Sequence, residues 1–79
     1  MMDITNFDVF DEIGNTIDCD ILGSHIAFHC FKCGYPILAV AIENERGWDE
    51  DNPARCKSCK APHILDIRAH KDIMYIYAI

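Results

Sequence analysis

Hydrophobic and polar residues alternate along much of the chain in the way that is typical of β-strands. Ile17, Cys19 and Ile21 fall on one face of an extended segment, and Asp18 and Asp20 fall on the other. This period of two predicts a strand with one face on a core and one in solvent.

The residues before this strand predict a turn and a partner strand. Residues 11–14, DEIG, have the form of a type I turn closed by a glycine in the left-handed region. β-Favouring residues flank the turn, so we predict a hairpin over residues 8–22. A short helix is the alternative, because Phe7, Phe10 and Ile13 recur at intervals of three.

Further short strands follow, separated by turns. LGSH predicts a turn, and residues 25–30 return as a strand; the longest apolar run, over 37–42, predicts a central strand. Residues 46–55 form a polar loop by their Gly, Asp, Asn and Pro content, and residues 63–79 a closing hairpin. The pattern predicts one all-β domain over residues 1–79, with about five to six short strands.

The composition indicates that the apolar core of this domain is too small to stabilise the fold by itself. The chain has 79 residues, of which 51% are hydrophobic, so it is globular but small. In a core of this size, conformational entropy nearly cancels the stabilisation from apolar burial. We therefore expect a metal ion or disulfides to hold the fold together.

The expected compartment favours a metal over disulfides. The N-terminal segment is acidic where a signal peptide is basic and then apolar, and no apolar run approaches the ~20 residues that cross a bilayer. We expect a cytoplasmic protein without membrane contact, whose cysteines stay reduced. The odd count of five cysteines points the same way.

Charge is distributed unevenly within a net charge of −6. Residues 1–20 hold six carboxylates and no Lys or Arg, and residues 43–51 hold five carboxylates against Arg46. The segment 55–71 has the opposite sign. Its basic residues are Arg55, Lys57, Lys60, Arg68 and Lys71. The net charge argues against a dominant phosphate-binding role, while this segment keeps a local one open.

Four of the cysteines form two closely spaced pairs. The pair Cys30 and Cys33 precedes the pair Cys56 and Cys59, with 22 residues between the inner cysteines. A gap of two residues lets both thiolates of a tight turn reach one tetrahedral ion, and two such turns supply four sulfur ligands. We predict one zinc ion, structural rather than hydrolytic because no coordination position remains for water.

Residues around the pairs fit two similar turns. Gly34 follows the first pair, where the chain turns back and the absence of a Cβ helps. Lys32 and Lys57 lie between the cysteines, where they would offset the negative charge of a zinc tetrathiolate. Pro36 and Pro62 each follow the second cysteine of their pair by three residues, so we expect each turn to lead into a strand.

The segments CFKCG and CKSC, with strand-like flanks, resemble the zinc-ribbon family over residues 25–79. This resemblance implies two knuckles, from two hairpins, that hold one zinc against a small antiparallel sheet. By resemblance the ligands are Cys30, Cys33, Cys56 and Cys59. Residues 1–24 lie outside the resemblance, and their own pattern predicts an N-terminal β-hairpin extension. Lys60 stands where the family often has Gly, and zinc ribbons serve many unrelated functions.

Three other interpretations of these cysteines stay open. CFKCGY also resembles the first iron-binding knuckle of rubredoxins, although CKSCKA lacks their Pro and Gly. A thioredoxin-type dithiol requires a βαβ context that the pattern does not show. In the third interpretation, the four cysteines are structural residues that bind no metal.

Other residues invite a functional interpretation. We predict that Cys19 is a small buried side chain on a strand face. The alternative is a free thiol with a functional role. His29 and His63 lie near the predicted ligands. Because four cysteines are already available, we expect neither histidine to bind the metal; the alternative is that one of them replaces a cysteine or hydrogen-bonds a sulfur. Trp48 either folds back over the sheet or anchors an interface.

For function we expect a protein-binding module, and the sequence shows no catalytic set. The module would be an adaptor or an inhibitor, of the kind that phages and other mobile elements encode, acting through the acidic loop 43–51. Its partner-binding residues would be Trp48, Asp49, Glu50 and Asp51. The alternative is nucleic-acid binding through Arg55, Lys57, Lys60, Arg68 and Lys71, and the lesser alternative is rubredoxin-like electron transfer.

Overall fold

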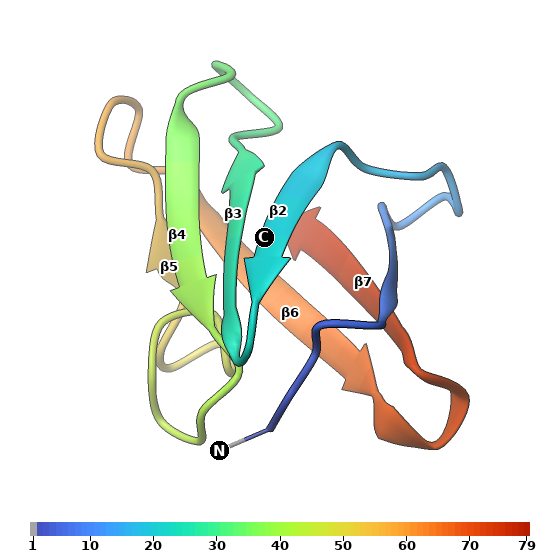
Figure 1. Ribbon diagram of the computed structural model, residues 1–79. Helices are drawn as coiled ribbons and strands as arrows, with labels where there is room; N and C mark the ends of the chain where they lie inside the picture. The colour runs from blue at the N-terminus through green and yellow to red at the C-terminus, as the bar shows by residue number, and fades with distance from the viewer. Residues whose placement is uncertain (1) are drawn as a thin grey trace.

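Two small β-sheets make up the structure, a computed structural model that describes residues 2–79 (Figure 1). The first sheet contains, in spatial order, β2 (Cys19–Leu22), β3 (His25–His29) and β4 (Pro36–Val40). The second contains β1 (Asp8–Phe10), β7 (Ile73–Ala78), β6 (Pro62–Arg68) and β5 (Ala54–Arg55). One 3-10 turn, η1 (Ala69–Lys71), lies in residues 2–79, which contain no α-helix. The predicted all-β class is confirmed, with seven strands in place of five to six.

Turns that are local in sequence connect most of the paired strands. β2 pairs with β3, β3 with β4, β5 with β6 and β6 with β7, each antiparallel. The closing hairpin forms as predicted, with η1 at its turn. β4 begins at Pro36 and β6 at Pro62, so each cysteine pair leads into a strand, as the repeated spacing predicted.

The N-terminal segment pairs differently from the predicted hairpin. The turn at residues 11–14 forms, and the Gly14 N–H donates to the Asp11 carbonyl at 3.1 Å. Beyond it, one bridge joins Phe10 to Thr16, while β1 runs parallel to β7 and β2 pairs with β3. The hairpin predicted over residues 8–22 therefore forms only next to its turn, where the Asp11 N–H donates to the Asn15 carbonyl at 2.8 Å and the Ile17 N–H donates to the Val9 carbonyl at 3.2 Å. The prediction of a sheet that is antiparallel throughout is wrong, because β1 is parallel to β7. A two-residue turn brings β2 onto β3 at a small loop-closure cost, and this pairing turns the apolar face of β2 to the core.

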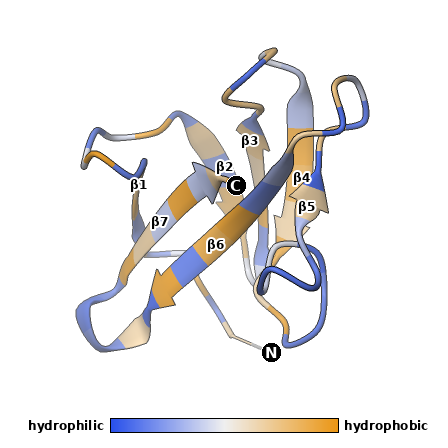
Figure 2. Ribbon diagram, turned by 180° about the vertical axis from the view of Figure 1, so that it is seen from behind, coloured by the Kyte–Doolittle hydropathy of each residue, from blue (hydrophilic) through white to orange (hydrophobic). Residues whose placement is uncertain are grey.

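The core lies between the two sheets (Figure 1). Ile26 and Phe28 from β3 pack with Met74 and Ile76 from β7, and all four side chains are almost fully buried. Figure 2 shows hydrophobic positions on β6 and β7 and a hydrophilic turn between them. Cys56 belongs to this core, so the end of the sheets where the cysteine pairs lie is continuous with the apolar interior.

The segment after β4 packs against β6. The Val40 N–H donates to the Arg46 carbonyl at 3.0 Å, and the Leu65 N–H donates to the Gly47 carbonyl at 2.8 Å. Gly47 has φ +94, and a Cβ there would lie 3.2 Å from Ala39 Cβ and Leu65 Cγ, so only glycine fits. β4 itself is at the edge of its sheet, so the central position predicted for it is wrong, and β3 takes that position.

Within residues 2–79, no helix has the length and apolar character that a membrane crossing requires.

Candidate metal centre

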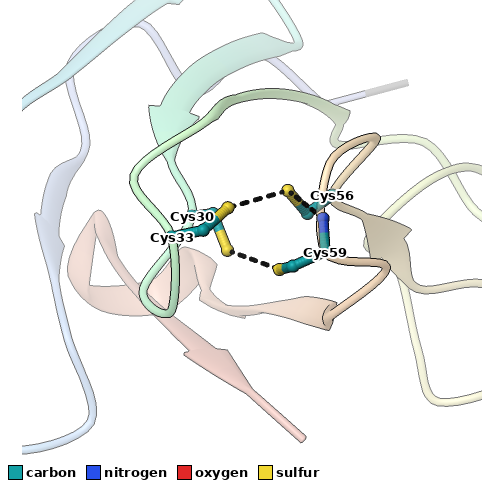
Figure 3. Close-up of side chains that lie close together, drawn as sticks. All are labelled: Cys30, Cys33, Cys56 and Cys59. Carbon is teal, nitrogen blue, oxygen red and sulfur yellow. Dashed lines mark hydrogen bonds between the residues drawn. The ribbon is translucent and has the colours of Figure 1, made fainter.

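Four cysteine sulfurs gather where two turns from the two sheets meet (Figure 3). The Sγ atoms of Cys30, Cys33, Cys56 and Cys59 all lie within 4.8 Å of one another. The Sγ atoms of Cys30 and Cys59 are 3.5 Å apart, and those of Cys33 and Cys56 are 3.4 Å apart. All four thiols are free, without disulfides. Sulfurs at 2.3 Å from a tetrahedral zinc are about 3.8 Å apart, so the cluster is close to the size that one zinc requires.

The first knuckle, residues 30–35, joins β3 to β4. The Cys30 N–H donates to the Tyr35 carbonyl at 2.9 Å, and the Gly34 N–H donates to the Cys30 carbonyl at 2.9 Å. Cys30 is buried and Cys33 is exposed. These bonds hold the turn closed, and both of its sulfurs point toward Cys56 and Cys59 of the second knuckle (Figure 3).

The second knuckle, residues 56–61, joins β5 to β6 and repeats this arrangement. The Cys56 N–H donates to the Ala61 carbonyl at 3.0 Å, and the Lys60 N–H donates to the Cys56 carbonyl at 3.0 Å. Cys56 is buried and Cys59 is exposed. The two similar turns that the sequence predicted are therefore present.

The knuckles also share a backbone angle. Gly34 has φ +80, in the left-handed region that glycine adopts freely. Lys60 occupies the equivalent position with φ +68, one of three non-glycine residues with positive φ among residues 2–79. A side chain with a Cβ is strained there, so the second knuckle forms despite its residue at this position.

Backbone N–H groups point at the first sulfur of each knuckle. The Lys32 N–H lies 3.3 Å from Cys30 Sγ, and the N–H groups of Ser58 and Cys59 lie 3.4 and 3.5 Å from Cys56 Sγ. Burial raises the pKa of the Cys56 thiol, but the N–H groups of Cys59 and Ser58, together with the neighbouring sulfurs of Cys33 and Cys59, outweigh burial, so the pKa is lowered. Thiolate is the form that binds a metal, so these bonds prepare the buried sulfurs for an ion.

The four thiols do not titrate alike. For Cys30, burial raises the pKa of the thiol. The N–H groups of Cys33 and Lys32 and the neighbouring sulfurs have the larger combined effect and lower the pKa to about 6. For Cys59, the Ala61 N–H lowers the pKa, but desolvation and the neighbouring sulfurs raise it to about 12. Negative charge at one sulfur opposes charge at the next, so a cation is what allows all four thiolates to form together.

His63 links the two knuckles from the side of the core. Its side chain is fully buried, and its Nε2 accepts the Phe31 N–H of the first knuckle at 3.2 Å. Its Nδ1 lies 3.0 Å from the Ala61 carbonyl of the second, so Nδ1 carries the proton and donates it. The ring makes edge contacts with Phe28 and Phe31, with centroids 5.6 and 5.4 Å apart. His63 thus neither replaces a cysteine nor bonds a sulfur; it fixes the backbone that carries the cysteines.

Two further residues singled out in the sequence lie outside the cluster. His29 is exposed at the end of β3, and Cys19 is half-buried at the start of β2. The alternation that placed Cys19 on the inner face with Ile17 and Ile21 is confirmed, because all three pack against the core cluster. Burial, followed by Asp20 and Asp18, raises the pKa of the Cys19 thiol, which disfavours its reactive thiolate form.

The acidic loop has a mixed environment. Trp48 is half-buried, and Glu50 and Asp51 are exposed. Asp49 is engaged within the loop, because its Oδ1 accepts the backbone N–H groups of Asp51 and Asn52 at 3.0 Å each. The loop is therefore shaped by its own hydrogen bonds, with two carboxylates directed to solvent.

The five basic residues of segment 55–71 do not form one surface. Arg55 pairs with Pro62 at the start of β6, whereas Arg68 ends that strand, about 20 Å away by strand rise. Arg68 forms an ion pair with Asp66 at 2.8 Å. Arg55 and Lys57 instead line a groove beside β4, which also includes Arg46. The sequence missed this grouping, since Arg46 lies in an acidic segment.

Searches of protein-family models, of curated proteins and of solved structures found no match to this chain. The metal centre therefore rests on its own geometry.

Proposed function

We propose that the chain is a zinc-stabilised protein-binding module in which the metal has a structural role. The convergence of four sulfurs within 4.8 Å, from turns that belong to different sheets, carries this proposal. Four protein ligands complete a tetrahedral zinc and leave no position for a water or substrate, which supports a structural rather than a catalytic ion. The zinc would join the two sheets at the end of the core.

The proposed partner carries positive charge. Glu50 and Asp51 are exposed at the tip of the loop, and neither takes part in an ion pair within residues 2–79. Trp48, half-buried beside them, supplies an aromatic surface of the kind that anchors interfaces. An adaptor or an inhibitor would use this loop to engage a basic surface.

Metal analysis of the purified chain tests the first half of the proposal. We expect one zinc per chain and a colourless protein by elemental analysis and absorbance. A red protein with one iron per chain would overturn the zinc assignment in favour of rubredoxin-like electron transfer.

Charge reversal tests the second half. Glu50→Lys with Asp51→Lys should abolish capture of the partner that the wild-type chain retains from a lysate of its host. Glu12→Lys, another exposed carboxylate reversal, is the matched control and should retain it. A partner captured equally by all three proteins would show that the loop is not the binding surface.

Nucleic-acid binding is the second candidate, and one observation favours it. A groove of about 500 Å³ is lined by Arg46, Arg55, Lys57 and Tyr35. Among residues 2–79, no carboxylate side chain lines this groove. Cations and a stacking aromatic are what single strands use. A labelled 20-nucleotide strand titrated at several salt concentrations tests it: three phosphate contacts give a slope of about −2 in log K against log salt. Absence of binding at low salt would exclude this function.

A further inference from the structure

The outer face of the β2–β3–β4 sheet exposes apolar side chains. This sheet lies in front of β6 and β7 in Figure 1, so its other face covers the core. Asp20, Ala27 and Leu38 form one row across the outer face, because Asp20 pairs with Ala27 and Ala27 with Leu38. Leu38 is 45% exposed, and Leu22, two residues beyond Asp20, is 82% exposed. On the central strand β3, Ala27 lies on this face between His25 and His29, which are both exposed, so the apolar side chains here are flanked by two histidines.

One side of this face is basic. The groove of about 500 Å³ lies here, where β5 runs beside β4. Tyr35 and Leu38 give it apolar walls, and Tyr35 is 47% exposed. Arg46, Arg55 and Lys57 supply its charge, and none of them forms an ion pair within residues 2–79.

The other side of the face is acidic. A smaller hollow of about 150 Å³ includes Asp18 and Asp20, and it shares Ala27 and Pro36 with the basic groove. Both carboxylates are exposed. Charge therefore changes sign across this surface, from the carboxylates at β2, through Ala27 on β3, to Arg55 on β5 of the other sheet, which lies beside β4.

We infer that this face binds a second copy of the chain in a symmetric dimer. A two-fold axis parallel to the strands places the acidic side of each copy on the basic side of the other, because a symmetric contact uses the same patch twice. Asp20 then faces the partner's Arg55, and the partner's Asp20 faces Arg55. The protruding Leu22 lies in the row of His25 and Val40, so it contacts the opposite copy at the end of β4, beyond Leu38.

A second copy fits this face better than a nucleic acid does. A phosphate backbone that enters the basic groove passes Asp18 and Asp20 on the same face and is repelled by them. A second copy carries both signs in matching positions. The net charge of −6 on each copy opposes association only over short range, because salt at 0.15 M screens charges beyond about 8 Å.

Sedimentation equilibrium of the zinc-loaded full chain tests the dimer through two charge reversals. Asp20→Arg and Arg55→Glu should each weaken self-association by at least about a hundredfold, because each creates two like-charge contacts in a symmetric dimer. Mixed in equal amounts, the two variants should associate with each other as tightly as the wild type does with itself, since both contacts are then of opposite sign. Lys71→Glu, in η1, reverses a charge away from this face and is the control that should leave the dimer unchanged.

Three outcomes would overturn this inference. The first is a wild-type chain that stays monomeric at millimolar concentration. The second is a dimer that both single variants retain, or that their mixture fails to restore while each binds one zinc. The third is a monomer that binds the labelled single strand and loses this binding on Arg55→Glu, which would assign the groove to nucleic acid.

Discussion

The two knuckles have the same hydrogen bonds but different residues where the chain turns back. The closing bond is 2.9 Å from Gly34 to the Cys30 carbonyl and 3.0 Å from Lys60 to the Cys56 carbonyl. Gly34 adopts its φ without strain, while Lys60 holds a similar φ with a Cβ present. The comparison shows that the ligand spacing and the bonds around it determine the turn, and that the residue at its end sets only the conformational cost.

Loss of the metal should separate the two knuckles and destroy both turns. This is the largest effect that we expect. Structural zinc contributes roughly 10–16 kcal/mol of apparent binding free energy in zinc-finger peptides at neutral pH, more than a core of this size supplies. Chelation, or Cys56→Ser, should therefore unfold the chain. Circular dichroism during thermal melting measures this.

Cys19→Ser is the matched control for this experiment. Cys19 lies outside the cluster, so this variant should bind one zinc and melt cooperatively. A metal-free chain that keeps the melting temperature of the zinc-loaded protein would contradict the structural role of the metal.

Removal of His63 should break the link between the knuckles. His63→Leu leaves the Phe31 N–H and the Ala61 carbonyl without their partner, and an unsatisfied buried group costs about 1–3 kcal/mol. We expect the free energy of unfolding of the zinc-loaded chain to fall by about 2–4 kcal/mol in urea, with weaker zinc binding in a chelator competition.

His29→Leu, which alters an exposed histidine, serves as the control and should change stability by less than about 0.5 kcal/mol. Equal effects of the two substitutions would show that His63 does not position the knuckles.

Gly34→Ala should give the first knuckle the strain of the second. No atom lies within 4 Å of the added Cβ, so its cost is confined to the backbone. A left-handed residue with a Cβ costs about 1–2 kcal/mol, and we expect a loss of that size in urea unfolding. An unchanged stability would mean that the knuckle relaxes to another φ.

Lys60→Gly should do the reverse and has the smallest expected effect. Relief of strain stabilises the second knuckle, but glycine also loses more entropy on folding, which leaves a gain of at most about 1 kcal/mol. Lys60→Ala keeps the strain and should not share this gain. If alanine stabilised the chain as much as glycine, the side chain of Lys60 rather than its φ would be the cause.

The sequence predicted the parts of the fold whose partners are close in the chain. Alternation at Ile17, Cys19 and Ile21 identified the inner face of β2. The predicted LGSH turn corresponds to the β2–β3 hairpin, and the predicted closing hairpin over residues 63–79 corresponds to β6–β7. The paired cysteines predicted the cluster because a two-residue gap leaves few geometries for two sulfurs. Local geometry is what sequence patterns record most directly.

Long-range pairing and the role of His63 were beyond these patterns. A three-residue strand such as β1 has no period that selects a partner, and its parallel pairing with β7 is set by packing of the whole chain. The sequence placed His63 four residues after Cys59 but could not place Phe31 against its ring. The Arg46, Arg55 and Lys57 groove was hidden for the same reason.

The parallel pairing of β1 with β7 has a consequence for folding during synthesis. Asp8 of β1 pairs with Ile73 of β7, 65 residues later in the sequence, so β1 is synthesised well before its partner. Both knuckles precede β7 in the sequence, so a metal ion that binds the four cysteines would bring them together before β7 is available. A metal bound by the four cysteines would thus join the two knuckles first, and the parallel pairing of β1 with β7 would follow.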